Sequence, residues 1–67
     1  MGLDRAKIKR LREQAALTHA AAAERAGLKG RRQAWYDIEA GRRANIKLET
    51  LERVAKALGV KAKDLLK

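Results

Sequence analysis

Three glycines divide this chain into short segments, and each follows a stretch that has the character of a helix. The glycines are Gly27, Gly41 and Gly59. Glycine often ends a helix because it takes the left-handed backbone conformation without strain. The clearest apolar spacing precedes Gly59, at positions i, i+3, i+6, i+7 and i+10, which is one buried helix face. These positions are Leu48, Leu51, Val54, Ala55 and Leu58. The pattern predicts several short helices and no strand.

Applied to the whole chain, the same reasoning predicts one all-α domain of five helices over residues 1–67. Asp4 can cap the first helix, and Ile8, Leu11 and Ala15 then share one face. Thr18 can cap the second, which is almost all alanine and therefore lets a neighbouring helix approach closely. The expected ranges after the first helix are 19–26, 31–40, 48–58 and 61–67.

The third helix has two chemically different faces. At about 100° per residue, Trp35 and Ile38 lie on one side, where they must pack inward. Gln33, Tyr36 and Asp37 lie on the other side, with Arg32 at its flank. A helix, a short turn containing glycine and a second helix with a polar outer face form the helix-turn-helix pattern.

The charge balance narrows the possible partners. Seventeen Lys and Arg face eight Asp and Glu, which gives a net charge of +9. Residues 28–47 have the highest density of positive charge, a net +4 from six basic and two acidic side chains. Such a surface attracts polyanions, with nucleic acid ahead of an anionic membrane or an acidic protein.

Other functions lack the residues that they need. The chain has no cysteine, no serine and a single histidine, His19, so we expect no disulfide, no metal site, no cofactor and no enzyme activity. No small-molecule ligand is evident. No apolar run is long enough for a signal or membrane-spanning segment, so we expect a cytoplasmic, nucleoid-associated protein without a membrane partner.

Many positions in register over nearly the whole chain resemble the phage-repressor and Cro type of helix-turn-helix domain, the XRE-like family. The matching residues are Ile8, Leu11-Arg12, Leu17-Thr18, Ala23 to Gly27, Ile38 to Arg43, Asn45, Leu48 to Leu51 and Val54 to Val60. The resemblance implies a five-helix, lambda-repressor-like domain whose third helix enters the major groove of double-stranded DNA. It also implies a structural ion pair between Arg12 and Glu39. Relatives commonly bind as dimers, for which this chain offers Leu65 and Leu66 of the last helix.

The chain departs from that family at several positions. His19 replaces a glutamine that commonly starts the second helix, and Ala22 replaces a leucine. Trp35 replaces a smaller aliphatic residue, so we expect its indole to fill the space beside Ala22. Lys47 and Lys61 replace capping Ser or Thr, so the last two helices lack those caps. The turn at Lys29-Gly30 is about two residues longer than usual, and the loop at Ala44 about one.

The candidate base-reading residues are Arg32, Gln33, Tyr36 and Asp37. Arg32 can grip guanine with two hydrogen bonds, and Gln33 can do the same for adenine. Tyr36 can press on a thymine methyl, bond a phosphate or cover the interface with the second helix. Asp37 can accept from cytosine or orient the amide of Gln33 four residues earlier.

The candidate phosphate contacts surround the third helix. They are Thr18, His19, Lys29, Arg31, Arg42, Arg43, Asn45 and Lys47. The interpretation is a sequence-specific DNA-binding regulator, either a repressor or an antitoxin-like or controller-type autoregulator. Two alternatives stay open: a protein-interaction adaptor of the multiprotein-bridging type, and a nonspecific nucleic-acid binder.

Overall fold

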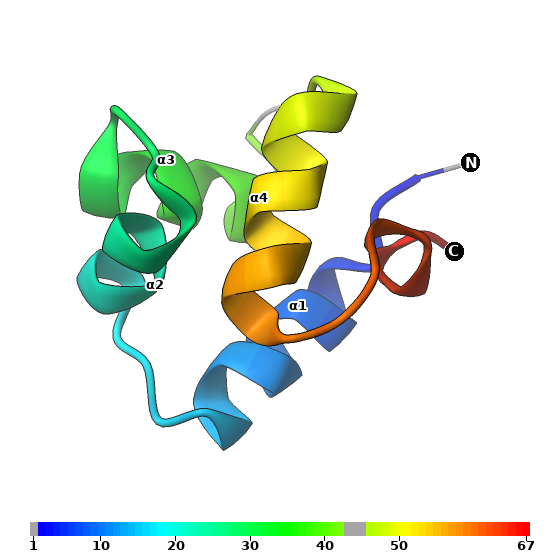
Figure 1. Cartoon of the computed structure of the whole chain (residues 1–67), viewed down its shortest axis with the longest axis horizontal. Coiled ribbons are helices and arrows are strands. Elements are labelled where there is room, and N and C mark those ends of the chain that lie inside the picture. Colours follow the sequence, from blue (N-terminus) through cyan, green and yellow to red (C-terminus); the bar gives the residue numbers. More distant parts are fainter. Residues whose placement is uncertain (1, 43–45) are drawn as a thin grey trace.

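The computed structural model describes residues 2–42 and 46–67, which form four α-helices and one 3-10 turn, η1 (Figure 1). Their bounds are α1 Arg5–Gln14, α2 His19–Ala26, α3 Arg31–Ala40, α4 Leu48–Leu58 and η1 Ala62–Leu65. α2 packs most extensively against α3 and next against α4, while α1 contacts both α3 and α4. None of the described helices is both long and apolar enough to cross a lipid bilayer.

The first two helices begin at side-chain caps that the sequence predicts. The Asp4 carboxylate accepts from the Lys7 backbone N–H at 3.2 Å, and the Thr18 hydroxyl accepts from the Ala21 N–H at 3.0 Å. Each bond satisfies a backbone donor that the first turn of a helix leaves unpaired. The α-helices α2, α3 and α4 end at left-handed glycines, which are Gly27 (φ 69°), Gly41 (φ 81°) and Gly59 (φ 74°).

In place of the expected fifth helix over residues 61–67, the structure has only a short 3-10 helix, η1. The last residues leave the helical path because they pair with the start of the chain. Leu66 forms an antiparallel bridge with Leu3, and the Lys67 N–H donates to the Gly2 carbonyl at 3.0 Å. The two ends of the chain therefore lie side by side, as Figure 1 shows.

The caps of the last two elements differ from each other. Lys47 precedes α4 and supplies no side-chain cap, as its replacement of a Ser or Thr predicts. At η1 the Asp64 carboxylate accepts from the Lys61 backbone N–H at 3.1 Å. This bond satisfies the Lys61 N–H itself, while Lys61 supplies no side-chain cap to η1.

The C-terminal leucines serve the monomer core. Leu65 is fully buried in this core, so its side chain has no exposed surface to offer a second copy, and the homodimer itself stays a prediction. Leu66 is partly buried and packs against the same core.

The centre of the domain combines a few large side chains with alanines. The largest fully buried residues are Trp35, Ile8, Ile38, Leu65 and Val54. Ala22 and Ala23 of α2 are also fully buried in this core. Their small side chains allow α2 and the Trp35 helix to approach closely, as the alanine-rich sequence predicts.

The buried face of α1 differs from the predicted one at its end. α1 stops at Gln14, so Ala15 lies beyond the helix and is exposed. Arg12 is instead buried, with 8% of its surface exposed. A charged residue therefore faces inward near the end of α1, where periodicity alone expects alanine.

The turn between α2 and α3 carries two unusual backbone features. A Cβ on Gly30 would lie 2.7 Å from the Ala34 Cβ, so only glycine fits this close approach. The next residue, Arg31, has φ 51°, a left-handed conformation that is uncommon for a residue with a side chain. α3 therefore begins at a strained residue directly after the glycine.

Candidate nucleic-acid interface

α3 shows the two faces that its sequence predicts. Trp35 and Ile38 are fully buried, and Arg32 and Gln33 are exposed on the opposite side. Because α3 packs on both α2 and α1, its inner face is held from two directions. The exposed side chains are thereby presented on a well-supported helix.

Gln33 and Asp37 form a hydrogen-bonded pair on the outer part of α3. The Gln33 Nε2 donates to the Asp37 Oδ1 at 2.9 Å, which is the i, i+4 contact that the sequence offered as one role for Asp37. A primary amide has two N–H donors and one oxygen acceptor. The pair therefore leaves one donor and the oxygen of Gln33 for another partner.

The Tyr36 side chain extends from α3 and contacts the first residue of α2 and a residue just beyond the end of α3. Its surface is 43% exposed, so it is neither a core residue nor a fully solvated one. The His19 ring meets it edge-on, with centroids 5.8 Å apart. The Arg42 guanidinium carbon lies 5.8 Å from the Tyr36 ring centroid on a cation–π contact.

These residues border a shallow depression on the surface. It has a volume of about 210 Å³ and is lined by His19, Arg32, Gln33 and Tyr36. Two helices contribute to it, α2 through its first residue and α3 through its outer face. The structure thus brings one candidate phosphate contact beside three of the candidate base-reading residues.

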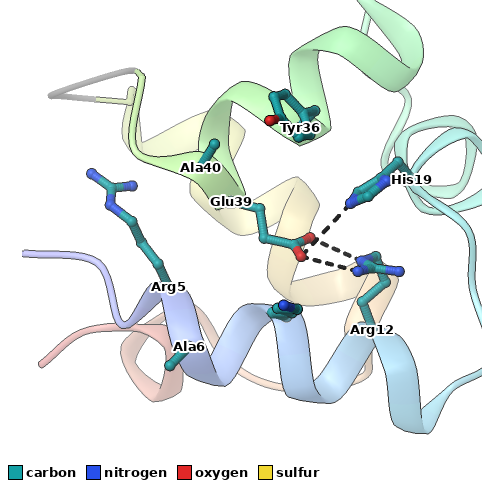
Figure 2. Close-up of a pocket in the computed structure, with 8 residues that line it drawn as sticks. Arg5, Ala6, Arg12, His19, Tyr36, Glu39 and Ala40 are labelled. Atoms are coloured by element: carbon teal, nitrogen blue, oxygen red, sulfur yellow. Dashed lines mark hydrogen bonds and ion pairs between the residues drawn. The ribbon is translucent and has the colours of Figure 1, made fainter.

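Beneath this surface, Arg12 and Glu39 form a two-bond ion pair between α1 and α3 (Figure 2). The Arg12 Nε donates to the Glu39 Oε2 at 2.9 Å, and the Arg12 Nη2 donates to the Oε1 at 3.0 Å. The side chains are only 10% and 7% exposed. The Trp35 Nε1 adds a third bond to the Glu39 Oε2, at 2.7 Å.

The surroundings set the charge states of both partners. Burial works to raise the pKa of Glu39, but the hydrogen bonds from Arg12 and Trp35 and the Arg12 charge outweigh it, so the pKa lies below its ordinary value. For Arg12, the hydrogen bonds to Glu39 outweigh burial and raise the pKa. Both groups therefore stay charged at neutral pH.

His19 faces this pair. Its Nε2 lies 3.7 Å from the Glu39 Oε1, beyond ordinary hydrogen-bond distance, and its side chain is 34% exposed. Figure 2 shows the ring extending from α2 toward Glu39. His19 therefore separates the buried ion pair from the surface depression.

The remaining candidate phosphate residues lie around α3. Lys29 and Arg31 are exposed at the turn before it, and Arg42 and Lys47 are exposed after it. Thr18 uses its hydroxyl to cap α2. The predicted contacts at Arg43 and Asn45 lie outside the described residues.

Among the contacts at this site that were not predicted from the sequence, two differ in the signal that was available. One is the Trp35 bond to Glu39, although the i, i+4 spacing of the two residues on one helix is a usable signal. The other is the Arg5 Nη1, which donates to the Ile38 carbonyl at 2.8 Å. Arg5 and Ile38 are far apart in sequence, and no local pattern indicates their contact.

The arrangement of α2, turn and α3 agrees with the comparison to known families. A family model described as a helix-turn-helix domain matches residues 5–66. A search of the curated proteins found no match, and neither did a search of the solved structures. Helix-turn-helix domains bind DNA through the second helix of the motif. Since the family model covers nearly all of the chain, this protein belongs to the helix-turn-helix domain family, a family of DNA-binding domains.

Proposed function

We propose that the protein is a sequence-specific regulator of transcription that reads the DNA major groove with the outer face of α3. The observation that carries this proposal is the contrast between the two faces of that helix. The inner face is buried at Trp35 and Ile38, and the outer face exposes Arg32 and Gln33. A major groove about 12 Å wide admits one such helix.

The outward groups match the edges of bases. Arg32 has the fork of donors that binds the O6 and N7 of guanine. The Gln33 amide gives one N–H to Asp37, and its other N–H and its oxygen suit the N7 and N6 of adenine. Each such pair discriminates against a wrong base by about 1 to 3 kcal/mol. Asp37 adds repulsion against misplaced phosphates and acceptors.

Tyr36 extends the same surface. Its ring is partly exposed, so it can contact a thymine methyl while its other side covers the start of α2 through His19. Two of the three roles that the sequence left open for Tyr36, contact with a thymine methyl and cover for the interface with α2, are compatible with each other in this position.

Basic and polar residues on both sides of α3 supply the phosphate contacts in this proposal. The residues are Thr18, His19, Lys29, Arg31, Arg42 and Lys47, with Arg43 and Asn45 beyond the described residues. The first N–H groups of α2 add donors that favour an anion. Phosphate contacts set the register and orientation of the domain but carry no sequence information.

A small domain of this kind can regulate by occupying an operator and blocking polymerase, as a repressor or an antitoxin-like or controller-type autoregulator does. Two copies on inverted half-sites about one helical turn apart fit this mode. The surface that joins them is not Leu65, which is buried.

The test is a selection from random duplex DNA at about 150 mM salt, with wild type, Arg32→Ala and Arg25→Ala. Arg25 is an exposed arginine of α2 and controls for loss of charge alone. We expect an enriched motif that relaxes at one base in Arg32→Ala and stays intact in Arg25→Ala. Two inverted copies of the motif would also indicate that the protein binds as a dimer.

The same experiment separates the competing functions. Retention without a motif, weakening only as salt rises, would identify a nonspecific nucleic-acid binder. No retention of any duplex would contradict DNA binding and favour an adaptor that contacts proteins.

A further inference from the structure

A basic cleft lies between α1 and α3, next to the proposed reading surface. It has a volume of about 310 Å³, and its cationic lining comes from Arg5, Lys9 and Arg12 of α1. These three residues are spaced i, i+4 and i+7, so they form one stripe along the helix. Figure 2 shows Arg5 and Arg12 rising from α1 toward α3.

Two of these cations already have structural partners. Arg12 neutralises Glu39 at the floor of the cleft, and Arg5 donates to the Ile38 carbonyl. Lys9 is exposed, and it makes no hydrogen bond or ion pair with the residues that the structure describes. Lys9 therefore provides a positive charge at the cleft that the fold does not use.

The cleft shares two lining residues with the depression beside the candidate base-reading residues. His19 and Tyr36 line both of them. If α3 occupies the major groove, a sugar-phosphate strand lies along each side of it, and the cleft is on the side where α1 packs against α3. The Glu39 carboxylate does not repel it strongly, because Arg12 and Trp35 already bind that carboxylate.

We infer that the cleft between α1 and α3 is a further DNA phosphate site, in which Lys9 pairs with one phosphodiester of the strand that passes α1. This inference rests on the proposed function. It extends the DNA-contacting surface to α1, a helix outside the helix-turn-helix pair. The ligand is the oxyanion of the DNA backbone, so the contact adds affinity without sequence preference.

The test compares Lys9→Gln with Arg10→Gln on the selected duplex. Arg10 is the adjacent exposed cation of α1, it lies about 100° further round the helix, and it does not line the cleft. One lost phosphate contact reduces the slope of log K against log salt by about 0.9, which corresponds to roughly fivefold weaker binding at about 150 mM salt. We expect this change for Lys9→Gln, no change in slope for Arg10→Gln, and recovery with Lys9→Arg.

A second measurement locates the phosphate. Single phosphates of the duplex are replaced in turn by uncharged methylphosphonates. We expect one position that weakens wild type about fivefold but has no effect on Lys9→Gln. Circular dichroism melting checks that the variants remain folded.

The outcomes distinguish a failure of this inference from a failure of the proposed DNA-binding function. An equal loss for Lys9→Gln and Arg10→Gln, or no methylphosphonate position that couples to Lys9, overturns the inference and leaves the DNA-reading function intact. Failure of wild type to bind any duplex overturns both.

Discussion

Replacing Glu39 with alanine is expected to destabilise this domain far more than replacing any exposed glutamate. The Glu39 carboxylate accepts two hydrogen bonds from Arg12 and one from Trp35. Its removal leaves the Arg12 guanidinium, with a side chain only 10% exposed, without its counter-charge. It also leaves the indole N–H of the fully buried Trp35 without an acceptor.

The size of the expected loss in stability follows from the burial of this ion pair. Removing one partner of a buried ion pair costs about 3 to 5 kcal/mol, and little solvent reaches this pair to screen it. In a domain of this size each kcal/mol shifts Tm by roughly 4 to 8 °C. The Tm of Glu39→Ala should therefore fall by at least about 12 °C. A single core in so short a chain supplies only about 3 to 5 kcal/mol in total, so the variant lies near the limit of folding.

The assay is thermal unfolding followed by far-ultraviolet circular dichroism, with Glu49→Ala as the matched control. Glu49 also pairs with an arginine on its own helix, since it accepts from the Arg53 Nη2 at 3.1 Å. That pair is open to water, with side chains 51% and 75% exposed. An exposed i, i+4 pair contributes about 0.3 to 0.5 kcal/mol, so the control should lose no more than about 4 °C.

Equal melting temperatures for Glu39→Ala and Glu49→Ala would refute the reasoning, because they would mean that the buried pair contributes no more than an exposed one. If Glu39→Ala does not fold, Glu39→Gln provides the test. Glutamine keeps the shape and an acceptor for Trp35 but removes the charge that Arg12 needs. Its Tm should lie clearly below those of wild type and Glu49→Ala, and a Tm equal to that of Glu49→Ala would refute the reasoning.

Three further predictions concern pH, backbone strain and salt. The pKa of Glu39 is lowered in the folded state. The stability that its charge gives the domain is therefore complete above the unfolded pKa of about 4.3 and is lost as the pH falls through the folded pKa. Thermal melts from about pH 7 to about pH 3 should show a larger loss of Tm for wild type than for Glu39→Gln, and parallel losses would contradict this. Arg31 (φ 51°) and Ala16 (φ 57°) both have a left-handed backbone conformation. Replacing either residue with glycine should therefore raise the free energy of unfolding in denaturant by about 0.5 to 1 kcal/mol, and a loss of stability would contradict the strain. Only Arg31→Gly should also weaken DNA binding. Neutralisation of about five to seven phosphates predicts a slope of log K against log salt of about −4.5 to −6 in a filter-binding titration, and a slope near zero would exclude the phosphate contacts.

The three helices that the sequence predicts best all end at a glycine. The expected ranges 19–26, 31–40 and 48–58 agree with α2, α3 and α4. α2 also has the Thr18 cap at its start, α3 has Trp35 and Ile38 on one face, and α4 has a long apolar face that ends at Gly59. These signals depend on neighbours within a few residues, so they can be read without knowledge of the fold.

The differences arise where distant segments meet. The 3-10 helix η1 ends at Leu65 because Leu66 pairs with Leu3, a contact between the two ends of the chain that periodicity does not contain. At the candidate site, the two faces of α3 follow from helical spacing. The direction of the His19 ring toward Glu39 does not, because it depends on how three helices pack and on which side-chain rotamers that packing leaves open.

α3 carries two i, i+4 pairs with opposite tasks, and their spacing explains how this small domain can combine stability with recognition. Trp35 and Glu39 lie inward and join α3 to α1 through Arg12. Gln33 and Asp37 start two residues earlier, about 200° round the helix, and their bond is exposed. If the proposed function is right, loss of the inner pair changes folding and DNA recognition together, because the whole helix is then free to shift. Loss of the outer pair frees only the Gln33 amide, so it changes recognition alone. The orientation of that amide relative to α1 is thus set by the Asp37 bond within α3 and by the Glu39–Arg12 pair between the helices.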